Sequence, residues 1–314
     1  MAIMNYIHQG YRPGAPPVGV KQSIWRCLPQ ALRIHQWSKN LLLGVPLITA
    51  HKLVDFAMWR QLFLAFFCFS FMASATYLIN DLIDLHNDRL HEAKRHRPMV
   101  NGDLPIPIAV MLSCTLAVSA AVVAAFMLPL SFSCFMAGYA LLTLAYSIEL
   151  KKHLLIDVIA LASLYTIRIL AGGAATGIIV SEWLLMFALF IFFSLALLKR
   201  YIEINRYTGE ESIPGRGYYA SDANIIRSVG PASGLMAVLV LSFYINSPDV
   251  RPLYSQPPLL WLICPIVIYW VMRMWFLAER GQVHHDPIVH AIRDWQTYVL
   301  GALCAAIITA AAVL

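Results

Sequence analysis

The chain has 314 residues, of which 60% are hydrophobic and only 13% are charged. A soluble domain carries about 25% charged residues, so this composition excludes an ordinary soluble protein. The net charge of +6 indicates a membrane protein with basic loops and requires no nucleic-acid partner.

Apolar blocks divide the chain into nine candidate membrane spans, each near the length of about 20 residues that a bilayer requires. They are 40–53, 57–83, 106–128, 130–149, 153–175, 181–199, 223–245, 258–279 and 290–313. The first block is the weakest, because it is short and contains Pro46. Short connections around 130–149 predict antiparallel neighbours, and the whole pattern predicts an all-α membrane bundle.

Positively charged loops stay in the cytoplasm, and this rule orients the spans. With the N-terminus inside, most cations outside the blocks fall on the cytoplasmic side, and Lys52, Arg60 and Arg251 fall on the other. The distribution predicts a multi-pass membrane protein whose basic loops lie in the cytoplasm. Scattered cysteines without close pairs support neither a zinc site nor a disulfide framework.

The N-terminal segment differs in composition from the rest. Residues 11–20 are rich in Pro and Gly, and no secretory signal precedes them. We therefore expect residues 1–28 to form a flexible cytoplasmic segment and residues 29–314 to form a single transmembrane domain.

The most informative segment, residues 80–98, follows a long apolar stretch. Asp81, Asp84 and Asp88 fall at positions i, i+3 and i+7, so on one helix they point within about 60° of one another. Carboxylates grouped in this way attract a hard cation such as Mg²⁺. Cations directly beyond them suit the phosphates that a metal would bridge; they are Arg89, Lys94, Arg95 and Arg97. A capped polar helix end is the alternative interpretation.

Two charged residues lie inside the fifth apolar block. Asp157 and Arg168 are 11 residues apart, so they face the same side of a helix but are separated by about 16 Å along its axis. Charged groups within a span usually line a polar cavity. A structural ion pair with another helix is the alternative. Gly172 lies beyond them and would permit close helix packing.

Polar residues at other block ends are weaker candidates. Lys39, Tyr146 and Lys151 could equally be membrane anchors. Lys199 and Glu203, which flank Arg200, are four residues apart and could pair with each other. The run His285-Asp286-Pro287 could simply begin the last helix.

The pattern Asn80-Asp81-x-x-Asp84-x-x-x-Asp88 resembles the first aspartate motif of the UbiA superfamily of intramembrane prenyltransferases. The resemblance extends from about residue 30 to 310. Further segments resemble the decaprenyl-phosphate phosphoribosyltransferase branch, and they are Gln36-Trp37-x-Lys39-Asn40, Lys94-Arg95-x-Arg97-Pro98, Tyr146-Ser147-x-x-Leu150-Lys151, Arg168-x-x-Ala171-Gly172 and Arg280-Gly281-x-x-x-His285-Asp286-Pro287. The family implies a nine-helix bundle whose central polar cavity opens to the cytoplasm and laterally to lipid.

One departure from the prenyl-donating members affects the expected substrate. Those members carry a second aspartate motif where this chain reads Leu198-Lys199-Arg200-Tyr201-Ile202-Glu203. A cationic patch would bind phosphate directly instead of through a second metal. The resemblance therefore implies transfer of phosphoribose from 5-phosphoribosyl-1-diphosphate to a polyprenyl phosphate, with Mg²⁺ as cofactor. The product would serve lipid-linked pentofuranose and cell-envelope glycan synthesis.

The resemblance also assigns expected roles. The expected metal ligands are Asp81, Asp84 and Asp88, and the catalytic set adds Lys94 and Arg97 to them. The expected substrate-binding residues are Lys39, Asn80, Arg95, Tyr146, Lys151, Asp157, Arg168, Lys199, Arg200, Glu203, His285 and Asp286. Two other functions stay open, namely prenyl transfer to an aromatic acceptor and a non-catalytic transporter or scaffold. Homo-oligomerisation is also left open.

Overall fold

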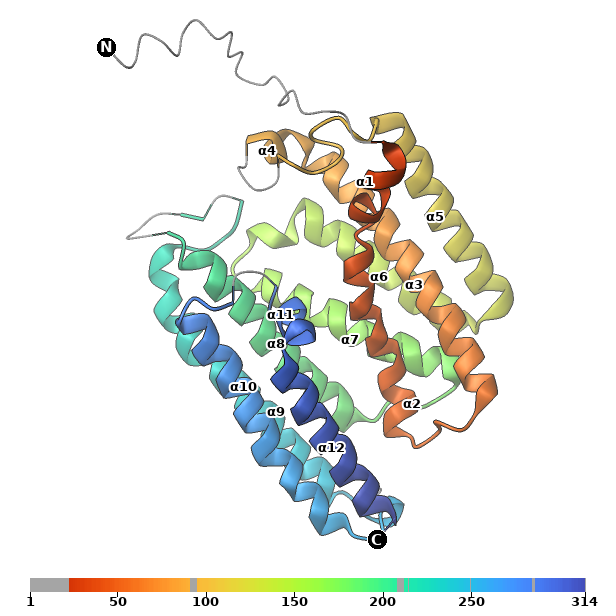
Figure 1. Cartoon of the computed structure of the whole chain (residues 1–314), viewed down its shortest axis with the longest axis vertical. Helices are drawn as coiled ribbons and strands as arrows, with labels where there is room; N and C mark the ends of the chain where they lie inside the picture. Colours follow the sequence, from red (N-terminus) through yellow and green to blue (C-terminus); the bar gives the residue numbers. More distant parts are fainter. Residues whose placement is uncertain are drawn as a thin grey trace, which may run out of the picture.

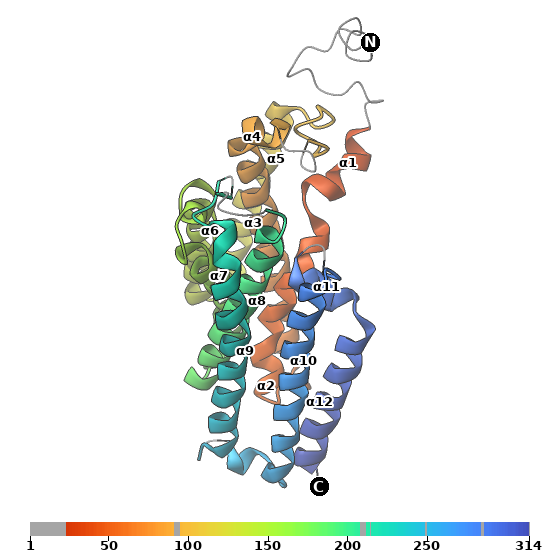
Figure 2. The ribbon, with the colours of Figure 1, turned by 90° about the vertical axis from the view of Figure 1, so that its left-hand side faces the viewer.

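The computed structural model describes residues 23–90, 95–207, 212–213, 215–248, 250–283 and 286–313. Eight of its helices are long and apolar enough to cross a membrane. They are α3 (Phe56–Ile83), α5 (Ile106–Met127), α6 (Leu130–Ile148), α7 (Ile156–Thr176), α8 (Glu182–Ile204), α9 (Ala223–Asn246), α10 (Ile263–Glu279) and α12 (Trp295–Val313). These helices confirm the all-α membrane fold and eight of the nine expected blocks. Figure 2 shows α9, α10 and α12 side by side along the long axis.

The ninth block, 40–53, does not form one long α-helix, unlike the other eight blocks. The chain here forms α1 (Ile24–Ala31), the 3₁₀-helix η1 (Ile34–Gly44) and α2 (Val45–Thr49). Pro46 has no N–H to continue a helix, and it stands in the first turn of α2, where none is needed. Lys39 and Asn40 of η1 are buried, so this segment faces polar partners within the protein instead of lipid.

Shorter elements connect the spans. They are α4 (Leu85–Leu90), η2 (Leu150–Lys152), η3 (Ala220–Asp222), η4 (Arg251–Leu253), η5 (Pro257–Leu262) and α11 (Pro287–Arg293). In Figure 1, α1 and α4 lie at one end of the bundle, while α2 and the C-terminus lie at the other. The expected boundary at residue 28 falls inside α1, and residues 1–22 lie outside the described part of the chain.

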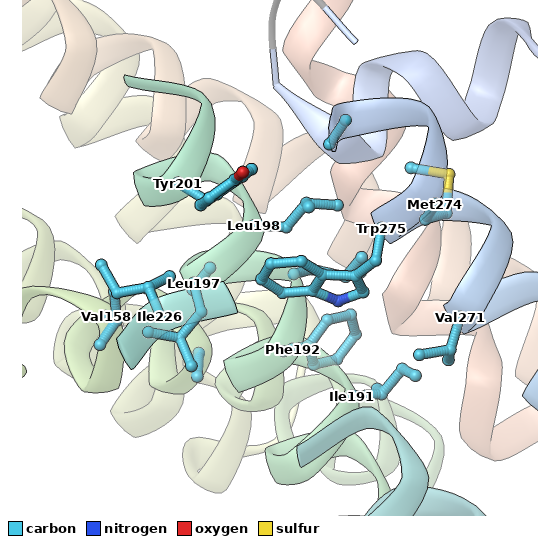
Figure 3. Close-up of a cluster of buried hydrophobic side chains, with 14 of the residues drawn as sticks. Val158, Ile191, Phe192, Leu197, Leu198, Tyr201, Ile226, Val271, Met274 and Trp275 are labelled. Carbon is cyan, nitrogen blue, oxygen red and sulfur yellow. The ribbon is translucent and has the colours of Figure 1, made fainter. Parts of the chain in front are cut away.

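Two apolar clusters hold the bundle together. The larger cluster joins α7, α8, α9 and α10, and Figure 3 shows the Trp275 ring close to Leu198 and Phe192 within it. The second cluster packs Phe69 of α3 against Phe132 and other residues of α6. η1 packs against both α3 and α7.

Candidate active site

A polar cavity of about 470 Å³ is lined by η1, α3, α6, α7, α8 and the residue before α11. Among the described lining residues, eight are Lys or Arg and three are Asp or Glu. The cations are Arg33, Lys39, Arg97, Lys151, Arg168, Lys199, Arg206 and Arg216, and the acids are Asp84, Glu203 and Asp286. This excess of positive charge suits a ligand that carries several negative charges.

Two of the three expected metal ligands lie just behind the cavity wall. Asp81 and Asp88 are 4% and 1% exposed. Nη1 of Arg97 donates to Oδ1 of Asp81 at 2.9 Å and also to Oδ2 of Asp88. Arg33 donates to the same oxygen of Asp81. The guanidinium of Arg97 therefore lies between the two carboxylates.

The third carboxylate, Asp84, lines the cavity and has its own cation. Nζ of Lys151 donates to both of its oxygens, at 2.9 and 3.0 Å. The expected single helical face is not formed, because α3 ends at Ile83, Asp84 caps it and Asp88 belongs to α4. After the break Asp84 faces Lys151, while Asp81 and Asp88 share Arg97, and these cations limit the mutual repulsion of the carboxylates.

The donor atoms of this region fit Mg²⁺ in kind. Three carboxylates and the Asn80 amide supply only oxygen ligands, which this cation prefers. In the arrangement described, however, ammonium and guanidinium groups hold the carboxylate oxygens. Within the described part of the chain, no three His, Cys, Asp or Glu side chains converge on a common metal position.

A second group of charges surrounds Asp286, on the side of the cavity formed by η1 and α8. Its Oδ2 accepts from Nζ of Lys39 at 2.8 Å and from Nζ of Lys199 at 3.2 Å. Its Oδ1 accepts from the backbone N–H of Ile288 at 3.0 Å, so Asp286 also caps α11. Burial alone would raise the pKa of Asp286, but the ammonium groups of Lys199 and Lys39 hold it well below its ordinary value.

Arg168 contributes a buried cation from α7. Its Nε donates to Oδ1 of Asn40 at 2.9 Å, and its Nη2 donates to the Tyr139 hydroxyl at 3.1 Å. Its Nη1 donates to the backbone carbonyl of Leu164. All these acceptors are neutral, and the guanidinium forms no ion pair with any described residue of the chain.

Two expected substrate ligands lie elsewhere. Arg200 is fully buried, with Nη2 2.6 Å from Oδ2 of Asp157. The Tyr218 hydroxyl donates to Oδ1 of Asp157 at 2.6 Å. Asp157 of α7 and Arg200 of α8 therefore form a buried ion pair, the arrangement that the sequence left open for Asp157. Asp157 does not share the cavity with Arg168, because both of its carboxylate oxygens face these partners.

The neighbouring Glu203 does line the cavity. It accepts from Arg200 and lies 3.5 Å from Nε of Arg216. Lys199 pairs with Asp286, so the pair between Lys199 and Glu203 that sequence spacing allowed is not formed.

The remaining residues that were expected to bind substrate or to act in catalysis fall into three groups. Asn80 and Tyr146 line the cavity. Arg95 is exposed, contacts His96 at 3.4 Å and is outside the lining. Lys94 and His285 lie outside the described residues.

Sequence reasoning missed several residues of the lining. They are Arg33, Gln36, Tyr77, Tyr139, Thr143, Tyr165, Arg206 and Arg216. Arg33 and Arg216 belong to the cytoplasmic cations that orientation already explains, so nothing local distinguished them. The hydroxyls of Tyr139 and Thr143, one helical turn apart within the block 130–149, were the available signal.

The sequence profile of the UbiA prenyltransferase family matches residues 42–287. The chain belongs to this family. A UbiA homolog from Archaeoglobus fulgidus, solved with DMAPP and Mg²⁺, superimposes with a TM-score of 0.65 at 16% identity, over 92% of this chain and 100% of the other. The protein is therefore an integral multi-pass membrane protein with a UbiA fold.

Several relatives are more similar to this chain in sequence than the Archaeoglobus fulgidus homolog is. The uncharacterized protein y4nM of Sinorhizobium fredii is 37% identical over 87% of this chain, which spans 54% of that longer protein. The nodulation protein NoeC of Azorhizobium caulinodans is 32% identical over 86% of this chain and 88% of NoeC. The decaprenyl-phosphate phosphoribosyltransferase of Mycolicibacterium smegmatis is 35% identical over 60% of each chain. The family profile and these relatives together show a membrane protein of the UbiA prenyltransferase family.

Proposed function

We propose that this protein transfers 5-phosphoribose from 5-phosphoribosyl-1-diphosphate to a polyprenyl phosphate and releases diphosphate. The observation that carries the proposal is the second charge group, in which Lys39 and Lys199 share Asp286. Prenyl-donating relatives place a second aspartate motif near Lys199, whereas here the local charge is positive. Similarity to the mycobacterial phosphoribosyltransferase supports the same substrates.

The cavity offers separate positions for separate phosphates. Arg33, Arg97 and Lys151 stand beside the aspartates and would hold the leaving diphosphate. Lys39, Lys199 and the unpaired Arg168 would hold a second anion, either the 5-phosphate of the sugar or the phosphate of the lipid. A prenyl diphosphate has one such anionic group, so in prenyl transfer the second position could be filled only by an anionic acceptor.

The chemistry follows from these positions. The bond between C1 of the ribose and the diphosphate oxygen breaks, and C1 develops positive charge as diphosphate leaves. A lipid phosphate oxygen, already anionic near pH 7, forms the new bond to C1, so no strong general base is required. Arg97 and Lys151 would stabilise the negative charge on the leaving group. Mg²⁺, held by Asp81, Asp84 and Asp88 with Asn80 assisting, would supply further charge neutralisation.

We further propose that η1 and α2 complete a ninth membrane crossing. At about 2.0 Å per residue, the 11 residues of η1 extend about 22 Å, and the five of α2 add about 8 Å. Together they approach the ~30 Å of a bilayer core. The cationic end of the cavity would then open to the cytoplasm, as the positive-inside distribution predicts.

The donor can be tested directly. Purified protein with polyprenyl phosphate would receive either labelled phosphoribosyl diphosphate or labelled geranyl diphosphate with an aromatic acid. We expect a labelled lipid only from the sugar donor. Prenyl transfer to the aromatic acid, without use of the sugar donor, would identify the protein as a conventional prenyltransferase.

A further inference from the structure

We propose that Arg97 and Lys151 are internal counter-ions that occupy the aspartate oxygens until a metal–diphosphate complex arrives, so that the metal binds strongly only together with the anion. This inference rests on the proposed magnesium–diphosphate chemistry, although it does not depend on which group the diphosphate carries. It gives the two cations a positioning role in addition to contact with the leaving group.

The first observation is the position of Arg97. One of its nitrogens donates to both Asp81 and Asp88, whose carboxylates are almost completely buried. A cation shared by two carboxylates stands where a metal bridging them would stand. Oδ1 of Asp81 and Oδ2 of Asp88 lose this competing cation only when Arg97 moves aside, and Arg97 then needs another acceptor. Oδ1 of Asp81 also accepts from Arg33, which would have to release it as well.

The second observation is the matching position of Lys151. It contacts both oxygens of Asp84, and the side chains of the two residues are each 18% exposed. Both residues line the cavity, so the ammonium group can turn from the carboxylate toward a ligand without leaving its place in the wall. Lys151 comes from η2, directly after α6, so two separate parts of the chain supply the counter-ions.

The charge of the cavity explains the coupling. A divalent metal on its own would displace Arg97 and Lys151 into a cavity already lined by other cations, among them Lys39, Lys199 and Arg168. Like charges that line one cavity repel one another, so binding of the metal without an anion is disfavoured. A diphosphate reverses the balance, because it carries negative charge and accepts the hydrogen bonds that the displaced cations lose. Metal and diphosphate must then strengthen each other's binding equally.

Metal binding can be measured without turnover. Mn²⁺ would serve as the probe for the Mg²⁺ site, and the loss of the free-ion electron paramagnetic resonance signal would report binding to the full chain in detergent. We expect weak binding of Mn²⁺ alone to the parent protein, and binding about tenfold tighter in Lys151→Met, in which the competing charge-assisted hydrogen bonds are gone. Arg97→Gln should behave in the same way and provides a second, independent variant.

Lys152→Met is the matched control. Lys152 is the adjacent residue, is half exposed and pairs with Glu149, outside the cavity lining. The control should leave the affinity for Mn²⁺ unchanged. The proposal is overturned if the control gains as much affinity as Lys151→Met, or if neither cavity variant gains any.

A second measurement follows the anion. Retention of labelled inorganic diphosphate should require a divalent metal in the parent protein and should fall about tenfold in Lys151→Met, even though that variant binds the metal better. Equal or better retention of diphosphate in Lys151→Met contradicts the proposal. Since these probes contain no sugar or lipid, a negative result here differs from a failure to form a phosphoribosyl lipid.

Discussion

At the scale of single residues, Arg168 and Arg273 show how differently two arginines within membrane helices are neutralised. Arg273 of α10 donates to both carboxylate oxygens of Asp294, at 2.6 and 3.1 Å. Arg168 of α7 donates to the neutral groups of Asn40 and Tyr139. A guanidinium keeps its charge at any accessible pH, and a buried charge without a counter-charge is costly. An anionic substrate group would supply the missing charge at Arg168.

Arg168→Lys should therefore raise the KM for a phosphorylated substrate at least about tenfold, because lysine keeps the charge but not the planar set of donors. Steady-state kinetics on purified protein would measure the change. Arg273→Lys, a matched change in a helix that does not contribute to the cavity lining, should leave that KM unaltered. Identical KM values for parent and Arg168→Lys would show that Arg168 has only a structural role.

Asp84 gives a sharper test of the aspartate region than Asp81 does. Replacement of Asp81 would also leave Arg33 and Arg97 without a common partner, whereas the Asp84 carboxylate forms its ion pair with Lys151 among the described residues. Asp84→Asn should lower turnover at least about 100-fold, and excess chelator should abolish it. Glu149→Gln, which changes an exposed carboxylate nearby, should turn over normally. Normal turnover of Asp84→Asn would exclude a role for this carboxylate in the reaction.

At the scale of elements, the contact between α7 and η1 depends on Gly172. A Cβ atom at this position would lie 2.0 Å from the carbonyl oxygen of Leu43, far inside van der Waals contact. Because the obstacle is backbone, α7 and η1 would have to separate. This contact holds Arg168 of α7 beside Asn40 of η1.

Gly172→Ala should destabilise the protein by about 1–3 kcal/mol, which lowers Tm by roughly 3–10 °C. Thermal unfolding in detergent would measure the shift. Gly301→Ala is the control, because a Cβ atom there meets nothing within 4 Å and alanine favours a helix. Equal Tm values for the two variants would contradict the tight packing of α7 on η1.

The same elements show how far sequence reasoning reaches. Apolar runs of about 20 residues predict helices, because a bilayer leaves the backbone no other partner. The path of η1 could not be predicted in this way, since it depends on the burial of Lys39 and Asn40 against distant groups. The end of α3 at Ile83 likewise accompanies ion pairs to Arg97 and Lys151, which are remote in sequence.

The candidate site residues also differ in how well the sequence predicts their position. Asp84, Lys151, Arg168, Lys199 and Asp286 stand out locally, as charges at or within apolar blocks, and the structure brings them to one cavity. Arg200 carried the same local signal but is buried against Asp157 of another helix. Spacing along the chain cannot distinguish these outcomes, because helix–helix packing decides them.

At the scale of the whole molecule, the positive-inside rule predicts the membrane orientation, with the cationic side of the cavity facing the cytoplasm. Val54 precedes α3 and Lys152 follows α6, so three spans, α3, α5 and α6, separate these two exposed residues. In a cysteine-free background, Lys152→Cys should react with an impermeant maleimide only in inside-out vesicles, and Val54→Cys only in intact cells. The reverse labelling pattern would contradict the proposed orientation.

The donor and the acceptor of the proposed transfer can be identified in one assay. Membranes containing the protein would be incubated with phosphoribosyl diphosphate labelled in the ribose and with a polyprenyl phosphate, and the lipid fraction would be analysed for label. We expect a labelled, phosphate-linked lipid that requires Mg²⁺ and both substrates and is absent with Asp84→Asn. No labelled lipid from fully folded protein under these conditions, together with prenyl transfer from a prenyl diphosphate, would contradict the account.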